Sequence, residues 1–225
     1  MQQRSAPSPI GIRHLLSYGL GDMYGGGAFL IIGMLFLFFL TETVGLPPWS
    51  GALIFGIGKV WDAVSDPLMG RISDRTRTRM GRRRFWILIA IPLVFLSFFL
   101  LWTALPNASA TLQVAYYTAV YVFFSTVFTM VMVPYSALNA DMTRDYRERS
   151  RLSGARMAFS MISALLAGTL PKIIINTSGG GPKGYGLMGA LFGAFYAIIL
   201  IPVVFGTREL PTEEEAELGG GLKDL

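Results

Sequence analysis

The chain has 225 residues, of which 52% are hydrophobic and 15% are charged, and its formal net charge is +5. Soluble domains usually carry about 25% charged residues, so this composition excludes an ordinary water-soluble core. Cysteine is absent and there is a single histidine, which argues against a disulfide framework, a zinc cluster and a nucleophilic triad. We therefore expect neither an enzyme nor a cofactor. The arginines gather between long apolar segments, which favours a membrane protein over a nucleic-acid-binding protein.

Apolar segments of about 20 residues recur along the chain, and this length lets a helix cross the hydrocarbon layer. Lipid cannot satisfy unpaired backbone groups, so such segments are expected to be helical. The fold class predicted for residues 1–206 is an all-α membrane protein, a bundle of six transmembrane helices. In chain order, the predicted spans are Leu15–Leu40, Trp49–Ile72, Phe85–Leu105, Leu112–Leu138, Leu152–Ile175 and Leu187–Gly206.

The distribution of basic residues predicts the orientation. Arginines precede the first span and fill the second and fourth connections, whereas the connections on the other side hold only Lys172 and Lys183. Because basic loops stay in the cytoplasm, both termini are expected there. Residues 207–225 are rich in glutamate and glycine. They are expected to form a solvated cytoplasmic tail or the start of a central linker.

The first predicted span contains an aspartate among many glycines. Small residues let helices approach closely in lipid, so close packing accounts for most of these glycines. Asp22 has two open interpretations: it lines a cavity, or it lies near the cytoplasmic end and meets only water. Tyr24 can either stack against a sugar ring or serve as a structural anchor.

The second predicted span contains two aspartates, Asp62 and Asp66, four residues apart and hence on one helix face. Two unpaired carboxylates would repel each other and resist leaving water. A bound cation, a shared proton or a basic neighbour relieves both costs. Lys59 lies one turn before Asp62, so a permanent salt-bridge network is the alternative to a cation site. Oxygen ligands without sulfur favour Na⁺ or H⁺ over a transition metal.

Several motifs follow one another over nearly the whole chain. They are Tyr18–Asp22 (YGLGD), Trp61–Gly70 (WDAVSDPLMG), Gly70–Arg75 (GRISDR), Gly81–Arg83 (GRR), Val133–Tyr135 (VPY) and Asp145–Arg149 (DYRER). Together they resemble the glycoside-pentoside-hexuronide:cation symporter family of the major facilitator superfamily. The resemblance implies two six-helix halves with the solute bound between them, of which this chain is similar to the N-terminal half.

The residues themselves and the family resemblance together give three groups of candidate site residues. The coupling-cation site is formed by Asp62, Ser65, Asp66 and Thr129, with both aspartates as ligands if the ion is Na⁺. The candidate solute contacts are Asp22, Tyr24, Lys59, Trp61, Tyr135 and Arg156. The cytoplasmic gating loop is represented by Gly70, Asp74, Arg75, Gly81, Arg82, Arg83, Glu148 and Arg149.

The sequence departs from the family pattern at several site positions. Ser65 replaces an asparagine, which leaves both Na⁺ and H⁺ open as the ion. Gly25 and Gly26 stand where a sugar-binding pocket has a lysine and an aspartate. Met132 replaces a second such aspartate, and Ser136 replaces a tryptophan. The resemblance therefore implies a retained coupling site beside a changed solute pocket, for a less polar or differently charged solute.

The resemblance implies cation-coupled symport of a sugar or related small solute by alternating access, in a bilayer such as the bacterial cytoplasmic membrane. The missing partner is a C-terminal half or a second copy of the chain. Two alternatives stay open: a carrier of the same fold for lipid-like or drug-like solutes, and a non-transporting half-transporter or scaffold. The position of the acidic tail, where a central linker would begin, favours a fragment of a longer protein over a dimerising half or a relic.

Overall fold

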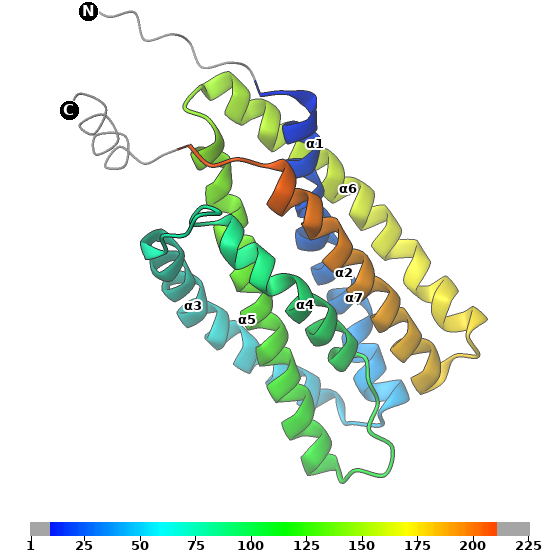
Figure 1. The fold of residues 1–225 in the computed structure, drawn as a ribbon. Coiled ribbons are helices and arrows are strands. Elements are labelled where there is room, and N and C mark those ends of the chain that lie inside the picture. Colours follow the sequence, from blue (N-terminus) through cyan, green and yellow to red (C-terminus); the bar gives the residue numbers. More distant parts are fainter. Residues whose placement is uncertain (1–9, 211–225) are drawn as a thin grey trace, which may run out of the picture.

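The computed structural model describes residues 10–210 and is all-helical over that range (Figure 1). The all-α bundle expected from the sequence is confirmed. In chain order the helices are α1 (Ile12–Leu20), α2 (Asp22–Phe38), the short π-helical segment η1 (Phe39–Thr43), α3 (Pro48–Arg75), α4 (Arg84–Leu101), α5 (Ala110–Met142), α6 (Tyr146–Thr177) and α7 (Gly181–Gly206).

The first predicted span corresponds to α1, α2 and η1 together, a stretch of 32 residues from Ile12 to Thr43. The boundary between α1 and α2 falls at Gly21, whose backbone angles stay in the right-handed helical region. A Cβ at Gly21 would collide with the ring of Tyr135 on α5. Glycine is therefore required here because α5 approaches the backbone of the first span directly.

Within residues 10–210, five helical stretches are long and apolar enough to cross a membrane: Ile12–Thr43, α4, α5, α6 and α7. The second predicted span corresponds to α3, where Lys59, Asp62 and Asp66 interrupt the apolar sequence. At 1.5 Å per residue, its 28 residues extend about 42 Å, enough for a hydrocarbon layer of about 30 Å. α3 is therefore the polar member of the bundle.

The helix boundaries differ from the predicted ones in several places: α6 begins at Tyr146 and α7 at Gly181, whereas the predicted spans began at Leu152 and Leu187. One further difference is informative. The third span was predicted to end at Leu105, but α4 ends at Leu101. The chain then turns through Asn107, which has a positive φ of 71°. Trp102, just after the end of α4, is fully buried in the core. The apolar part of the sequence therefore continues past the end of the helix.

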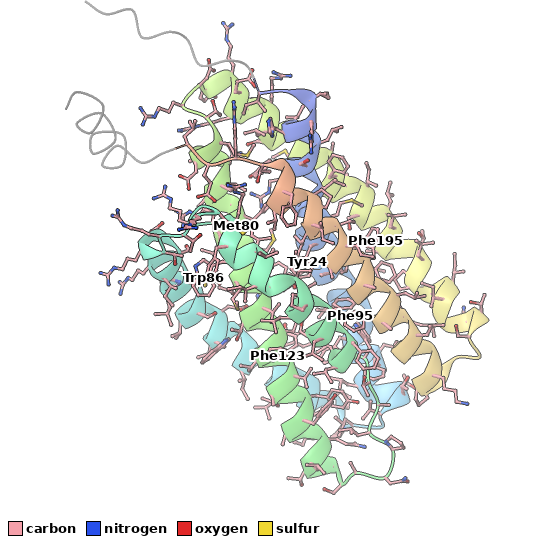
Figure 2. All side chains as sticks on the ribbon, in the orientation of Figure 1. Tyr24, Met80, Trp86, Phe95, Phe123 and Phe195 are labelled. Carbon is pink, nitrogen blue, oxygen red and sulfur yellow. The ribbon has the colours of Figure 1, made fainter. Side chains whose placement is uncertain are left out.

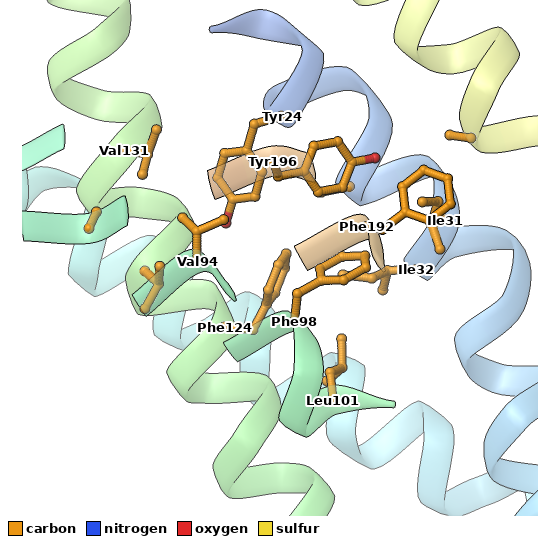
Figure 3. Close-up of a cluster of buried hydrophobic side chains, with 14 of the residues drawn as sticks. Tyr24, Ile31, Ile32, Val94, Phe98, Leu101, Phe124, Val131, Phe192 and Tyr196 are labelled. Carbon is orange, nitrogen blue, oxygen red and sulfur yellow. The ribbon is translucent and has the colours of Figure 1, made fainter. Parts of the chain in front are cut away.

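The core lies between α2, α4, α5 and α7 (Figure 3). Phe98 of α4 is fully buried, with its ring centroid 5.5 Å from that of Tyr196 on α7 and 6.1 Å from that of Phe124 on α5. Ile31 and Ile32 of α2 are buried in the same cluster. Close aromatic packing of this kind fixes the four helices as one scaffold.

Several helices keep exposed apolar side chains, and some of the most exposed lie on α3 and α6. On α6, Met161 and Leu165 are 69% and 72% exposed, and on α3, Val60 and Val64 are 70% and 59% exposed. Such faces need either lipid or another protein surface to cover them. α3 and α6 lie at opposite edges of the bundle (Figure 1), so both edges are open to such a surface.

Candidate functional site

The two aspartates of α3 face two hydroxyl groups of α5. The Thr129 hydroxyl donates to Asp66 Oδ1 at 2.6 Å, and the Ser125 hydroxyl donates to Asp62 Oδ1. Both contacts join residues 63 positions apart, so a step of one turn on α3 matches a step of one turn on α5. Ser125 and Thr129 are only 3% and 4% exposed. The two helices thus bring a pair of carboxylates and a pair of hydroxyls together in one layer.

Lys59 contacts only one of the two carboxylates. Its Nζ lies 3.3 Å from Asp62 Oδ2, and it also lies over the ring of Phe29, 5.5 Å from the centroid. The lysine side chain is 68% exposed. This contact therefore offsets the charge of Asp62 and leaves that of Asp66 without a basic partner among the described contacts. Asp66 accepts its hydrogen bond from Thr129 alone among the contacts described for residues 10–210.

The aspartate pair opens onto a cavity of about 530 Å³ between α2, α3 and α5. Lys59, Asp62 and Asp66 lie on one side of its lining, and the apolar part of the lining is formed by Phe29, Phe128, Met132, Val133 and Ala137. Small-molecule sites in proteins commonly measure about 300–1,000 Å³. The cavity therefore combines a charged end with an apolar wall at the size of a small solute.

Ser65 gives a test of whether this site suits a cation. Its side chain lies between the two aspartates in sequence, is 8% exposed, and its Oγ has no hydrogen-bond partner. A buried, unpaired polar group costs about 1–3 kcal/mol, so an additional partner at this position is favourable. Residues 10–210 contain no group of three His, Cys, Asp or Glu side chains that could hold a metal ion. The oxygen-only set around Asp62 and Asp66 suits Na⁺ or H⁺.

Asp22 and Arg156 form a second polar group, between α2 and α6. Arg156 Nε donates to Asp22 Oδ1 at 2.9 Å, and its Nη1 donates to Ser136 Oγ at 3.4 Å. Asp22 is only 9% exposed. The interpretation in which Asp22 meets only water is therefore wrong, because the arginine neutralises it inside the bundle. Ser136 also lines the cavity, so this ion pair borders the candidate site.

Two of the tyrosine and tryptophan candidates for solute contact lie in the protein core. Tyr24 is fully buried against Phe128 and Tyr196. Tyr135 is also fully buried, and it supports the guanidinium of Arg156 at 5.0 Å from its ring centroid. Neither tyrosine lines the cavity in this conformation, and their assignment as solute contacts stays a prediction.

Trp61 also lies apart from the acidic cavity. Its indole N–H donates to Thr126 Oγ1 at 2.8 Å, and its ring borders a separate groove with Val60 and Val64 on the outer face of α3. Being 40% exposed, it lies on the outer face of α3. Trp61 therefore ties α3 to α5 beside the aspartates without lining their cavity.

A charged cluster lies at the end of the bundle where the α3–α4 and α5–α6 connections meet (Figure 2). Arg82 Nη2 and Arg83 Nε reach the same carboxylate, Asp141 at the end of α5, at 2.7 and 3.1 Å. Arg83 also pairs with Asp74 and donates to Ser73 Oγ at 2.7 Å. The hydrogen bond to Asp141 raises the pKa of Arg82. The cluster thus joins α3, α4 and α5 through charged groups.

Glu209 completes this cluster from the far end of the described chain. Its carboxylate accepts the backbone N–H groups of Arg82, Arg83 and Arg84 at 2.8, 3.1 and 3.0 Å. The N-cap of α4, Arg83, makes no side-chain cap of its own. Arginines at a helix N-terminus oppose the helix dipole, whereas a carboxylate satisfies both the dipole and the free N–H groups. Glu209 therefore caps α4 across 125 or more residues.

This contact changes the expectation for the tail. The side chain of Glu209 is 8% exposed, and the N–H of Leu210 donates to the Asp141 carbonyl at 2.8 Å. The first residues after α7 are therefore packed against α4 and α5 rather than solvated. The rest of the expected tail, residues 211–225, lies outside the described residues.

The remaining gating-loop candidates lie in two separate parts of the structure, the end of α3 with the connection that follows it, and the start of α6. Gly81 has a positive φ of 103° and turns the chain into α4, beside the cluster. Gly70 and the exposed Arg75 lie on the last turns of α3. Glu148 pairs instead with Arg151 at 2.8 Å. Arg149 donates to the Thr143 carbonyl at 3.0 Å, so both belong to the start of α6.

Asp141, Glu209 and Ser125 were missed by the sequence reasoning. A signal was available for Ser125, because Ser125 and Thr129 repeat on α5 the four-residue spacing of the two aspartates. Asp141 and Glu209 stand at the ends of apolar segments next to arginines. Their partners lie more than 50 residues away, a distance over which sequence spacing gives no guide.

Replacing Glu209 by glutamine should lower the thermal stability of the protein. A glutamine oxygen can accept some of the three N–H groups but brings no negative charge, and hydrogen bonds to charged groups contribute about 1.5–3 kcal/mol. The expected fall in apparent melting temperature is about 5 °C. Thermal unfolding in detergent measures it, with Glu42→Gln, at an exposed carboxylate on the opposite end, as control. Equal melting temperatures for Glu209→Gln and Glu42→Gln would contradict this role.

The helical bundle, with its polar α3 and open apolar faces, is one six-helix half of a major facilitator fold. Residues 17–222 match the family described as MFS/sugar transport protein. The chain belongs to this family.

The chain is similar to several symporters along most of its length. It is 32% identical to a putative glycoside/cation symporter of Escherichia coli over 93% of the chain and 46% of that protein. It is 35% identical to an uncharacterized symporter of Synechocystis sp. over 74% of the chain and 32% of that protein. It is 28% identical to the sodium-dependent lysophosphatidylcholine symporter 1 of Xenopus tropicalis, over 78% and 33% respectively. The chain thus spans a third to a half of the length of these relatives, which are transporters and not enzymes.

Proposed function

We propose that this chain is the N-terminal half of a cation-coupled symporter, which moves a sugar or related small solute across a membrane by alternating access. The observation that carries the proposal is the layer of Asp62, Asp66, Ser125 and Thr129, which opens onto the 530 Å³ cavity. Carboxylates inside a membrane span are costly and are kept for function. The family and the relatives named above support the same activity.

The coupling follows from the charges in this layer. Lys59 offsets one of the two carboxylates, and Asp66 has only a hydroxyl partner. A cation between the aspartates removes the remaining repulsion and draws α3 toward α5. This favours one arrangement of the cavity wall, to which both helices contribute. If the cation raises the affinity for the solute, the solute must raise the affinity for the cation by the same factor.

A second six-helix bundle is proposed to cover the exposed apolar faces of α3 and α6, which lie at the two edges of this bundle, and to enclose the solute between the two bundles. The partner is a C-terminal half of the same protein or a second copy of the chain, and the length of the relatives supports the first. The arginine-rich end of the bundle is proposed to face the cytoplasm, with both termini, in a membrane of the bacterial inner-membrane type.

A lipid-like or drug-like solute is the second candidate. Phe29, Phe128 and Met132 form a continuous apolar part of the cavity lining. Such a wall fits an acyl chain or an aromatic body better than a fully hydroxylated sugar ring. The sodium-dependent lysophosphatidylcholine symporter among the relatives supports this candidate. Both candidates share the same cation site and differ only in the solute.

Uptake into proteoliposomes tests the proposal. The protein from its complete reading frame is reconstituted and supplied with labelled glycosides or lysophospholipids, under a Na⁺ gradient, a proton gradient or no gradient. We expect accumulation of one solute class that requires one of the two ion gradients. Uptake that is equal without any gradient would contradict cation coupling. Uptake of neither solute class under either gradient would instead support the non-transporting scaffold.

A further inference from the structure

Ser125 has a single described polar contact, which is its donation to Asp62. It is 3% exposed, so bulk water does not compete for its hydroxyl. The neighbouring hydroxyl on α5, Thr126, points elsewhere: it donates to the Val122 carbonyl and accepts from the Trp61 indole. Of these two adjacent side chains, only Ser125 is directed at the acidic layer.

The hydroxyl oxygens of Ser125 and Thr129 remain available as acceptors in this layer. A hydroxyl has one hydrogen to donate and two lone pairs that accept. The hydrogens of Ser125 and Thr129 are already used on the two carboxylates, so their oxygens face the layer only as acceptors. Ser65, which lies between the two aspartates in sequence, has a third hydroxyl that is unpaired and more than nine-tenths buried. A single proton can be shared by only one pair of oxygens, whereas a metal cation is coordinated by several oxygens at once.

We propose that Ser125 is a further cation ligand, which with Asp62, Asp66, Thr129 and Ser65 builds an all-oxygen site for an alkali cation such as Na⁺. This inference rests on the proposed function and goes beyond it, because it assigns a new ligand and selects a metal cation over a proton. Ser125 lies against Asp62 as Thr129 lies against Asp66. Each carboxylate therefore brings its own hydroxyl to the ion.

The variant Ser125→Ala removes one ligand oxygen while both carboxylates remain. Its matched control is Ser97→Ala, another buried serine, whose hydroxyl donates only to the Val94 carbonyl on α4. Purified protein from the complete reading frame is melted in choline chloride and in increasing NaCl at constant ionic strength. A ligand that binds only the folded state stabilises it by RT ln(1 + [L]/Kd), so the melting temperature rises with the logarithm of the ligand concentration once that concentration exceeds Kd. The readout is the NaCl concentration that gives a fixed, chosen rise in melting temperature.

We expect the wild-type protein and Ser97→Ala to reach the chosen rise in melting temperature at the same NaCl concentration, and Ser125→Ala to need about tenfold more Na⁺, which corresponds to about 1.4 kcal/mol. An unchanged NaCl concentration for that rise in Ser125→Ala would overturn the assignment of this ligand. Stabilisation of the wild type by lower pH but not by Na⁺ would overturn the alkali-cation site, while the proposed symport would stand with H⁺. The proposed function fails separately, if uptake needs neither ion gradient.

Discussion

Asp66→Asn should reduce ion-driven uptake by at least about 100-fold. The substitution leaves Asp62 with Lys59, 3.3 Å away, as its counter-charge, so no uncompensated negative charge remains to attract a cation. Two charges at 4 Å near a protein surface interact by about 4 kcal/mol. Losing the attraction between Asp66 and the cation is therefore more than enough to reduce uptake by this factor. Asparagine is close in size to aspartate, so the packing of α3 against α5 should be kept. Initial uptake rates under ion gradients in proteoliposomes measure the effect.

The control for Asp66→Asn is Glu42→Gln, which removes an exposed carboxylate at the other end of the first span. Its uptake should match the wild type at every ion concentration. Uptake by Asp66→Asn that keeps the wild-type ion dependence would show that the second aspartate is not part of the coupling site. Loss of folded protein can be separated from loss of coupling, because solute binding without a gradient is measured on the same samples.

Asp141→Ala should lower the stability of the protein strongly. Asp141 is the shared partner of Arg82 and Arg83, and Arg83 is only 7% exposed. Removing one partner of a buried ion pair costs about 3–5 kcal/mol, because it leaves an uncompensated buried charge. The expected fall in apparent melting temperature is about 10 °C. Thermal unfolding in detergent, followed by intrinsic fluorescence, measures it.

A double-mutant comparison tests the reason for this loss. In an Arg83→Met background the buried charge is already removed, so Asp141→Ala should cost clearly less than in the wild type. The same loss of stability in both backgrounds would show that the unpaired charge of Arg83 does not cause the destabilisation by Asp141→Ala. A melting temperature for Asp141→Ala within 1 °C or so of the wild type would contradict a structural role for the cluster.

The sequence alone predicted the membrane helices and the placement of the two aspartates on one face of α3. Long apolar segments leave few alternatives to membrane helices, and the four-residue spacing of Asp62 and Asp66 places both on one face of α3. The same rule, applied to α5, would have paired Ser125 with Thr129. The spacing did not reveal that Lys59 contacts Asp62 alone, because that depends on where α5 and Phe29 lie.

Other features depend on contacts that spacing cannot show. Tyr24 and Tyr135 have the amphipathic character of a solute contact, yet both are fully buried. The hydrogen-bond partner of Tyr135 comes from another helix, since its hydroxyl donates to the Tyr18 carbonyl. Glu209 looked like part of a solvated acidic run, and only the three-dimensional fold brings it to the N-terminus of α4. Long-range partners of this kind are set by helix packing rather than by local sequence.

The central claim is that Asp62 and Asp66 hold a travelling cation. Binding of radioactive ²²Na⁺ to the purified protein, with proton release recorded on the same sample, tests it most directly. The account predicts saturable Na⁺ binding or proton exchange in the wild type, and loss of both in the double variant Asp62→Asn/Asp66→Asn. Equal ion binding and proton exchange in the wild type and the double variant would contradict the claim.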